Sequence, residues 1–179
     1  MKGLNTQQGL TLIELLISLT LLSVVLIGGI PAFSDFTANN RMITEKNRLV
    51  GEVNLARSEA ILRSQRVVLC PSTDGMQCLA DPHWHAGRLI FIDSNANRER
   101  DPNELILRAT EATDASLSVL TPRSRRRVIF YPIGFAPGSN ATFTFCDGRG
   151  ADHAQAVILS NTGRPRTSSR GPGGRELRC

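Results

Sequence analysis

The sequence predicts an α+β protein in which one long N-terminal helix packs on antiparallel β-structure. Three observations support this prediction. Residues 10–30 are almost wholly apolar and have about the length of a membrane-spanning helix. Residues 31–64 carry apolar side chains at helical spacing, and residues 65–179 hold short β-rich runs separated by Gly, Pro, Asn and Asp.

The composition of the 179 residues argues against an enzyme. The chain carries 21 Lys and Arg against 16 Asp and Glu, a formal net charge of +5, and its 41% of hydrophobic residues is too high for a disordered chain. Three histidines leave little room for a His-based metal site or a catalytic triad, and the acidic residues are scattered. We therefore expect no catalytic residues, no metal site and no cofactor.

Residues 10–30 form the predicted membrane span, and Glu14 is their only charge. A carboxylate in hydrocarbon is costly unless it is paired or protonated, which favours a functional role for Glu14 over a position at the wet interface. The polar leader, residues 1–9, precedes the apolar run, whereas an ordinary secretory signal ends in a cleavage site after it. The span should therefore be retained and followed by an exported domain.

Residues 31–64 read as an amphipathic helix packed on one side against that domain. Pro31 should kink or end the preceding helix, because proline removes a backbone hydrogen bond. The apolar positions recur at spacings of three, four and seven and are Phe33, Phe36, Ile43, Val50, Val53, Ala56 and Ala60.

The remainder of the chain contains six β-rich runs separated by turn residues, which predict one or two antiparallel sheets against the helix. The runs are residues 67–70, 88–92, 105–107, 127–130, 142–146 and 156–160.

Residues 9–16, with the sequence GLTLIELL, closely resemble the class III signal of type IV pilins and pseudopilins. The resemblance implies that a prepilin peptidase cuts after Gly9 and N-methylates Leu10, where the family usually has Phe. It also implies that Glu14 pairs with the N-terminal amine of a neighbouring subunit during assembly. A charge in a low-dielectric setting is tolerable when such a partner arrives.

The order of elements along the whole chain resembles the GspH/FimT group of minor pilins and pseudopilins. The resemblance implies a type IV pilin fold with four segments: a leader peptide at 1–9, an assembly helix at 10–30, an amphipathic helix at 31–64, and a β-rich domain at 65–179 whose basic tail is 161–179. It also implies a single-pass inner-membrane protein with a periplasmic domain, which assembles with other pilins into an extracellular pilus.

A domain outside the inner membrane lies where disulfides form. Cys70 and Cys78 bracket a short loop, Cys146 lies on a late predicted strand, and Cys179 follows the tail. Three pairings are formally possible. We expect the pairs Cys70–Cys78 and Cys146–Cys179, and the second would pin the Gly- and Pro-rich tail onto the sheet.

Two other patterns could bind a metal, but a structural role is favoured for both. Residues 93–104 approximate an EF-hand loop, yet Arg98 replaces the glycine at position six and strands replace the flanking helices, so a hairpin turn is favoured over Ca²⁺. The loop's oxygen ligands would be Asp93, Asn95, Asn97 and Glu104. Residues 83–85, His-Trp-His, lack a third ligand, so a packed Trp84 is favoured.

Arginines gather in two places, residues 123–127 and the tail. A mobile segment with five arginines and one acid, Glu176, suits phosphate groups, because Arg pairs bidentately with phosphate. The tail has no aromatic residue, so its binding to nucleic acid should be non-specific and dependent on salt. The candidate residues are Arg164, Arg166, Arg170, Arg175 and Arg178.

Residues 163–166, Gly-Arg-Pro-Arg, match the Gly-Arg-x-Arg element of FimT-type minor pilins, which is associated with DNA capture during natural transformation. The resemblance carries over Arg164 and Arg166, and the other tail arginines follow by charge alone. We expect a minor pilin that binds extracellular double-stranded DNA. Three alternatives stay open: a solvated tail that contacts the next pilin or acidic lipid, a structural priming pilin, and a pseudopilin of type II secretion.

Overall fold

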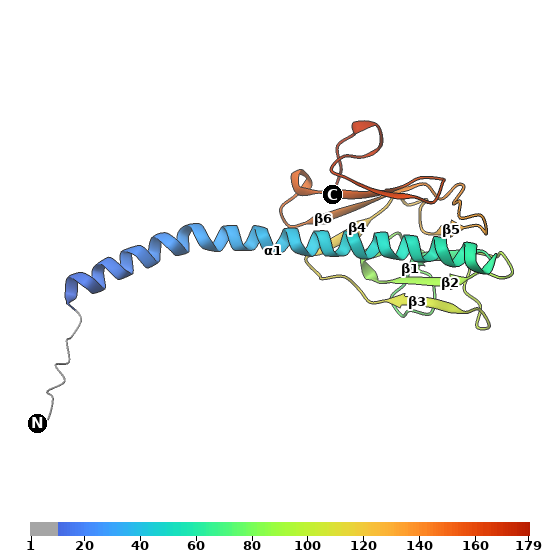
Figure 1. Cartoon of the computed structure of the whole chain (residues 1–179), viewed down its shortest axis with the longest axis horizontal. Coiled ribbons are helices and arrows are strands. Elements are labelled where there is room, and N and C mark those ends of the chain that lie inside the picture. The colour runs from blue at the N-terminus through green and yellow to red at the C-terminus, as the bar shows by residue number, and fades with distance from the viewer. Residues whose placement is uncertain (1–10) are drawn as a thin grey trace, which may run out of the picture. The chain divides into compact units, whose positions relative to one another are not determined.

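The computed structural model describes residues 11–179, so the expected cleavage site Gly9 and methylation site Leu10 lie outside the described residues. The chain divides into two compact units, residues 1–39 and residues 40–179. One helix, α1 (Leu12–Arg63), contributes to both units, and all the strands belong to the second (Figure 1).

The N-terminal half of α1 is long and apolar enough to cross a membrane, with a mean hydropathy of 2.4 over its most apolar window. Glu14 lies in the first turn of the helix. Pro31 was predicted to kink or end the preceding helix. It lies inside α1, so the helix does not end there. A single proline removes one backbone hydrogen bond, and the turns on either side keep theirs.

The second half of α1 supplies the helical side of the core. Its buried apolar side chains follow spacings of seven, four, three and four and are Met42, Leu49, Val53, Ala56 and Ala60. The predicted apolar face was wrong at its N-terminal end, where Phe33, Phe36 and Ile43 are exposed. Phe33 and Phe36 belong to the first unit, whose described residues contain no strand that could cover them.

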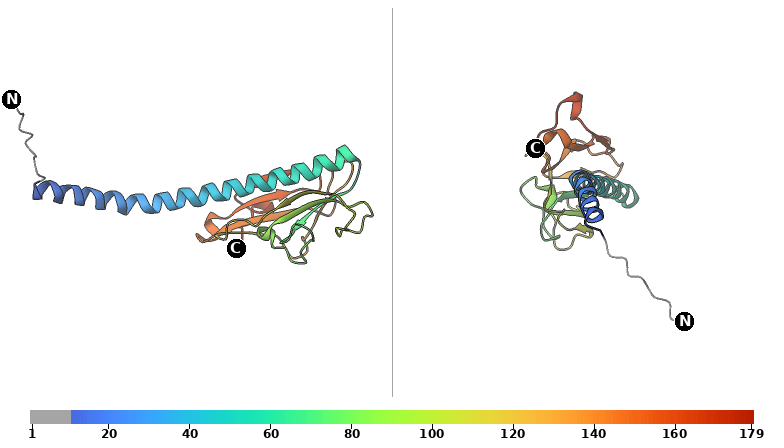
Figure 2. Two further views of the ribbon diagram at one scale, coloured as in Figure 1. Left: turned by 90° about the horizontal axis from the view of Figure 1, so that it is seen from below. Right: turned by 90° about the vertical axis from the view of Figure 1, so that its left-hand side faces the viewer.

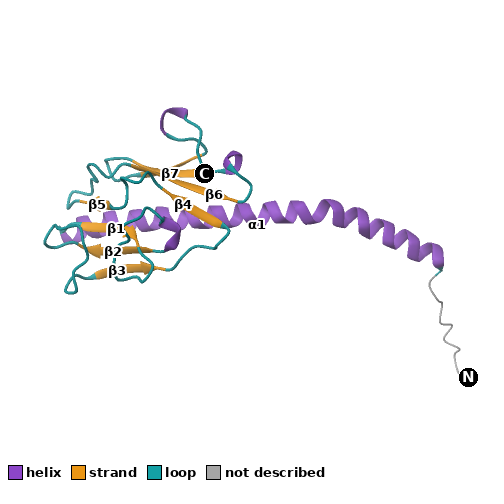
Figure 3. Ribbon diagram, turned by 180° about the vertical axis from the view of Figure 1, so that it is seen from behind, coloured by secondary structure: helices purple, strands orange, loops and turns teal. Residues whose placement is uncertain are grey.

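The strands of the second unit form two four-stranded antiparallel sheets on one side of its helix (Figures 2 and 3). The first sheet has the order β3-β2-β1-β5, from β1 (Val67–Pro71), β2 (Arg88–Ile92), β3 (Ile106–Thr110) and β5 (Val128–Phe130). The second has the order β4-β6-β7-β8, from β4 (Leu117–Leu120), β6 (Ala141–Asp147), β7 (Gln155–Leu159) and β8 (Pro165–Ser168).

The six predicted runs all became strands, and two further strands were missed. β4 alternates buried Leu117 and Val119 with half-buried neighbours, a period-two pattern too short to stand out in the sequence. β8 begins at a proline and is polar. Such a strand is tolerated at the edge of a sheet, and β8 lies at the edge of the second sheet, where it pairs with β7 alone.

The inner faces of both sheets pack on α1 around one apolar cluster that includes Leu69, Phe130 and Phe143. A buried ion cluster lies in the same interface. The Arg88 guanidinium in β2 contacts the carboxylates of Glu45 and Glu52 in α1, with 2.6 Å between Arg88 Nη2 and Glu45 Oε1. Arg88 and Glu52 are almost fully buried, so the cluster holds the helix in one register over the sheet.

Candidate functional site

The Gly-Arg-Pro-Arg element forms the end of the β7–β8 hairpin. Residues 160–163 make the turn, in which the Gly163 amide donates to the Ser160 carbonyl over 2.9 Å. Gly163 is buried at φ +76°, and a Cβ there would lie only 2.4 Å from the Gly134 carbonyl oxygen. The turn is also tied to the neighbouring loop, because the Ala136 amide donates to the Asn161 carbonyl over 2.8 Å. The glycine therefore fixes where Arg164 leaves the turn.

Arg164 and Arg166 lie on the outer face of the second sheet, opposite to α1. Arg166 is the register partner of Ile158 in β7, and cross-strand partners share a face. Ile158 packs in an outer apolar cluster with Cys146 and Leu177, whereas its neighbour Leu159 belongs to the inner core. The Ser160 amide donates to the Arg164 carbonyl, so Arg164 continues the pairing with Ser160 as its partner. Because Arg164 and Arg166 are two residues apart in an extended segment, their side chains lie on the same face.

Residues 169–179 fold back over this outer face as the red segment of Figure 1. The predicted disulfide Cys146–Cys179 is present and joins the tail to β6. Leu177 is buried against the outer cluster, and the Gly171 amide donates to the Arg175 carbonyl over 2.8 Å. The expectation that the tail is a mobile segment is corrected in part. Strand β8 and the segment held by the disulfide give most of the tail a defined backbone.

The five tail arginines share one property: they are exposed. Within residues 11–179, none of the five guanidinium groups donates a hydrogen bond or forms an ion pair. The nearby carboxylate of Asp147 is engaged by Arg149, whose side-chain hydrogen bond holds the pKa of Asp147 below its ordinary value. The donors of the tail arginines are therefore available to an external anion.

The second arginine cluster, residues 123–127, is held by the protein. Arg125 donates to the Gly138 carbonyl over 2.6 Å, Arg126 donates to the Ala80 carbonyl over 2.9 Å, and Arg127 is ion-paired with Glu99. Trp84 is fully buried, as predicted, and its Nε1 donates to the Thr121 hydroxyl over 2.9 Å at the start of this loop. The guanidinium groups of Arg125, Arg126 and Arg127 thus have partners within the protein, unlike those of the tail arginines.

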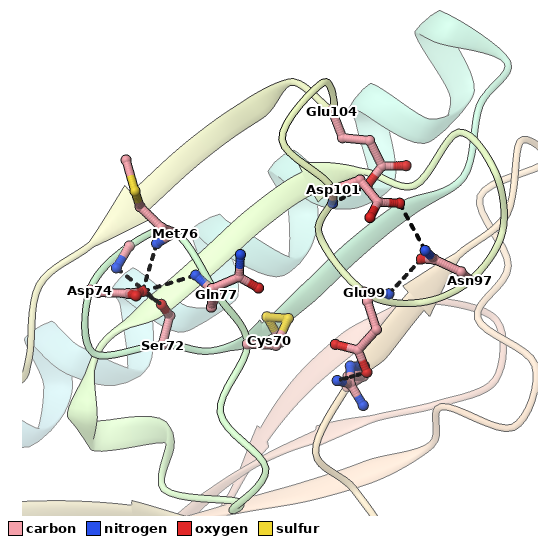
Figure 4. The surroundings of a disulfide bond; sticks show 12 residues. Cys70, Ser72, Asp74, Met76, Gln77, Asn97, Glu99, Asp101 and Glu104 are labelled. Carbon is pink, nitrogen blue, oxygen red and sulfur yellow. Dashed lines mark hydrogen bonds and ion pairs between the residues drawn. A yellow bond between two sulfur atoms is a disulfide. The ribbon is translucent and has the colours of Figure 1, made fainter.

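The predicted disulfide Cys70–Cys78 is also present and closes a short loop after β1 (Figure 4). Inside the loop the Asp74 carboxylate accepts from the amides of Met76 and Gln77 at 2.8 and 2.9 Å. The backbone hydrogen bond from Gln77, followed by that from Met76, holds the pKa of Asp74 below its ordinary value. The hydrogen bonds of the Asp74 carboxylate are made within the loop itself, which indicates a structural role for Asp74.

Residues 93–104 connect β2 to β3, which pair antiparallel, so the predicted hairpin is confirmed. Arg98 adopts φ +69°, the left-handed conformation that a glycine would take at this position. The Asp101 carboxylate accepts from the Asn95 and Asn97 amides, and Glu104 accepts from Ser94 (Figure 4 shows the Asn97 contact). Among residues 11–179 no three His, Cys, Asp or Glu side chains are grouped to hold a metal.

Two family models match the chain. The model described as type II transport protein GspH matches residues 45–163, which is well over half of the chain. The prokaryotic N-terminal methylation motif matches residues 4–30, the range that contains the predicted cleavage site and Glu14.

One curated relative is the pilin-like protein PilA1 of Thermus thermophilus, which is 39% identical over 101 residues. The match covers 55% of this chain and 56% of that protein, so the chain spans little more than half the length of the curated relative.

Two crystal structures of the type IV minor pilin FimU of Pseudomonas aeruginosa have a similar fold. One has a TM-score of 0.61 at 20% identity and covers 78% of this chain and 98% of that chain. The other has a TM-score of 0.52 at 19% identity and covers 72% and 94%. At such identities the likeness establishes the fold, a long helix packed on antiparallel sheets.

Proposed function

We propose, from the premise that this chain belongs to the type II transport protein GspH family, that it binds DNA through its tail arginines. The chain is a minor type IV pilin or a GspH-like pseudopilin, as the methylation motif and the pilin fold together establish. Within that class we propose a role in binding and assembly, without catalysis.

The proposed path begins at the membrane. A prepilin peptidase removes residues 1–9 and methylates Leu10, and the apolar half of α1 then holds the protein in the inner membrane with its second unit in the periplasm. On assembly into a pilus, Glu14 pairs with the N-terminal amine of the adjacent subunit. The exposed tail would then meet extracellular DNA, which pilus retraction draws inward.

The observation that supports DNA binding is the set of five exposed tail guanidinium groups without protein partners among residues 11–179. Arg166 lies on the edge strand β8 and Arg164 lies immediately before it, after a turn fixed by Gly163. Arginines without an internal acceptor keep all their donors for phosphate oxygens, and their charges release counterions from DNA. Because no aromatic residue lies in the tail, the binding should not depend on sequence.

The test is the affinity of the full chain, purified in an uncharged detergent, for a labelled DNA duplex over a series of NaCl concentrations. Each phosphate contact contributes about 0.9 to the log–log slope, so Arg164→Gln with Arg166→Gln should lower the slope by about 1.8. The matched control is Arg63→Gln with Arg108→Gln, which removes two exposed or half-exposed arginines elsewhere and should leave the slope unchanged.

If the Arg164/Arg166 variant has the same DNA affinity and the same salt-dependence slope as the wild type, these two arginines are not part of the DNA-binding site. Absence of binding by the unaltered chain at low salt would leave the other function open to the family, a structural pilin or pseudopilin whose tail contacts neighbouring subunits. The GspH family match favours that second function, and deletion of the protein should then abolish assembly.

A further inference from the structure

The arginine loop 123–127, together with the 93–104 hairpin, lines a polar pocket of about 270 Å³. Four arginines line it, namely Arg98, Arg125, Arg126 and Arg127, and no acidic residue does. Glu99, which is ion-paired with Arg127, is mostly exposed. A pocket with this lining has a strong preference for an anion.

Hydrogen-bonding capacity in this pocket is left over after the protein's own contacts. Arg127 Nε is buried and has no hydrogen-bond partner, which is costly for a donor that has been removed from water. The Arg98 guanidinium makes no hydrogen bond or ion pair within residues 11–179, although the Arg98 backbone amide donates a hydrogen bond to the Asp93 carboxylate. Ser139 is buried and accepts from the Ile129 amide, so its hydroxyl hydrogen can still be donated.

The pocket is connected along the surface to the tail. An adjacent pocket of about 440 Å³ shares Ser124 and Arg125 with it and extends to Pro172 in the tail. A third pocket, of about 380 Å³, shares Pro172 with the second and is lined by Arg175 and Arg178, and also by Glu176. The two arginine clusters, separate in the sequence, are therefore linked by neighbouring pockets that share lining residues, and we call this series of pockets one surface.

We propose that Arg98, Arg126 and Arg127 form a second site for a backbone phosphate of DNA, at the opposite end of this surface from Arg175 and Arg178. A row of separated anion sites suits a chain of phosphates, because one duplex can occupy them all, whereas a single headgroup can fill only one. The inference rests on the proposed function, since it extends the same DNA contact beyond the tail. It gives the 93–104 hairpin a role in positioning Arg98.

The experiment compares four double variants of the full chain in the same DNA titration, one of which is the tail variant Arg164→Gln with Arg166→Gln. The pocket variant Arg98→Gln with Arg126→Gln should weaken binding at low salt about tenfold and lower the log–log slope by about 0.9 to 1.8. The control Arg63→Gln with Arg108→Gln should match the wild type. Arg98→Lys with Arg126→Lys keeps both charges, so it should restore the slope, and it also tests the pocket if the Gln variant unfolds.

The outcomes separate this inference from the proposed function. Loss of binding in the tail variant with wild-type binding in the pocket variant overturns the second site and leaves the tail. Loss in the pocket variant alone supports the second site and removes the tail. If the pocket variant keeps its DNA affinity but loses binding to phosphatidylglycerol vesicles, the second site is also overturned and the pocket belongs to lipid headgroups.

Discussion

Gly163 shows at the scale of one residue how the fold presents the Arg164–Arg166 pair. Its missing side chain allows the turn to approach the Gly134 carbonyl, which itself accepts from Arg57 in α1 over 3.0 Å. The sequence identified this glycine by its place in a motif. The reason for it is a contact between loops far apart in the chain, which no local pattern reports.

We expect Gly163→Ala to destabilise the fold by about 3 kcal/mol, because Ala meets both a positive φ and a backbone oxygen within contact distance. Gly138→Ala is the matched control, since Gly138 has φ +72° but open space where the Cβ would lie. It should cost only about 1 kcal/mol for the left-handed backbone. Urea unfolding of both variants measures the difference, and equal losses would show that the Gly134 contact is unimportant.

Whether the role of a residue could be predicted from the sequence depends on whether that role is local. The cysteine pairs and the buried Trp84 were predictable, because spacing and size specify them. Arg98 and Arg127 were not singled out as binding residues, since their common pocket exists only after a hairpin and a distant loop meet. Arg125 and Arg126 were recognised in the sequence only as part of a basic cluster. Their hydrogen bonds to the Gly138 and Ala80 carbonyls depend on tertiary contacts, which the sequence does not show.

At the scale of elements, the join between α1 and β2 is the feature that hydrophobic periodicity does not reveal. Glu45 and Glu52 lie on the helix face that points at the sheet, where a periodic pattern predicts apolar residues. Arg88 in β2 is ion-paired with both carboxylates and also donates to the Trp84 carbonyl over 3.1 Å. The helix and strands were therefore predictable as elements, while their pairing through a buried charge cluster was not.

Arg88→Met should destabilise the protein by about 3 to 5 kcal/mol, because it leaves two buried carboxylates with only the more distant and exposed Arg48 as an ion-pair partner. Adding Glu45→Leu and Glu52→Leu to the same chain removes those charges and should recover most of the loss. Thermal unfolding by circular dichroism measures both variants. A mild effect of Arg88→Met alone would mean that water or Arg48 satisfies the carboxylates.

The whole molecule combines two disulfides with different expected effects. Cys146 and Cys179 are 33 residues apart and enclose the tail, whereas Cys70 and Cys78 are 8 apart and enclose a self-satisfied loop. The general α+β order was predictable because each element carries its own pattern. The pinning of the tail by Cys146–Cys179 was predicted as well, but strand β8 was not, because it gains its structure only from pairing with β7.

Cys146→Ser with Cys179→Ser should cost about 3 kcal/mol, and it should also lower DNA affinity because Arg175 and Arg178 lose their fixed position. Cys70→Ser with Cys78→Ser is the control and should leave DNA affinity unchanged. Unfolding curves and DNA titrations of the two full-length variants provide the comparison. Unchanged DNA affinity in the Cys146→Ser, Cys179→Ser variant would show that the arginines do not need the disulfide to hold them in place.

The order of the cysteines along the chain also bears on how the bonds are made during export. Each bond joins neighbours in the sequence, the first with the second and the third with the fourth. If the second unit is exported as proposed, Cys70 and Cys78 enter the oxidising compartment before the other two cysteines, so Cys78 meets Cys70 as the first available thiol of the chain. That pair is consumed before Cys146 arrives, so we expect vectorial oxidation to give the native pairing with an oxidant alone, without a disulfide isomerase.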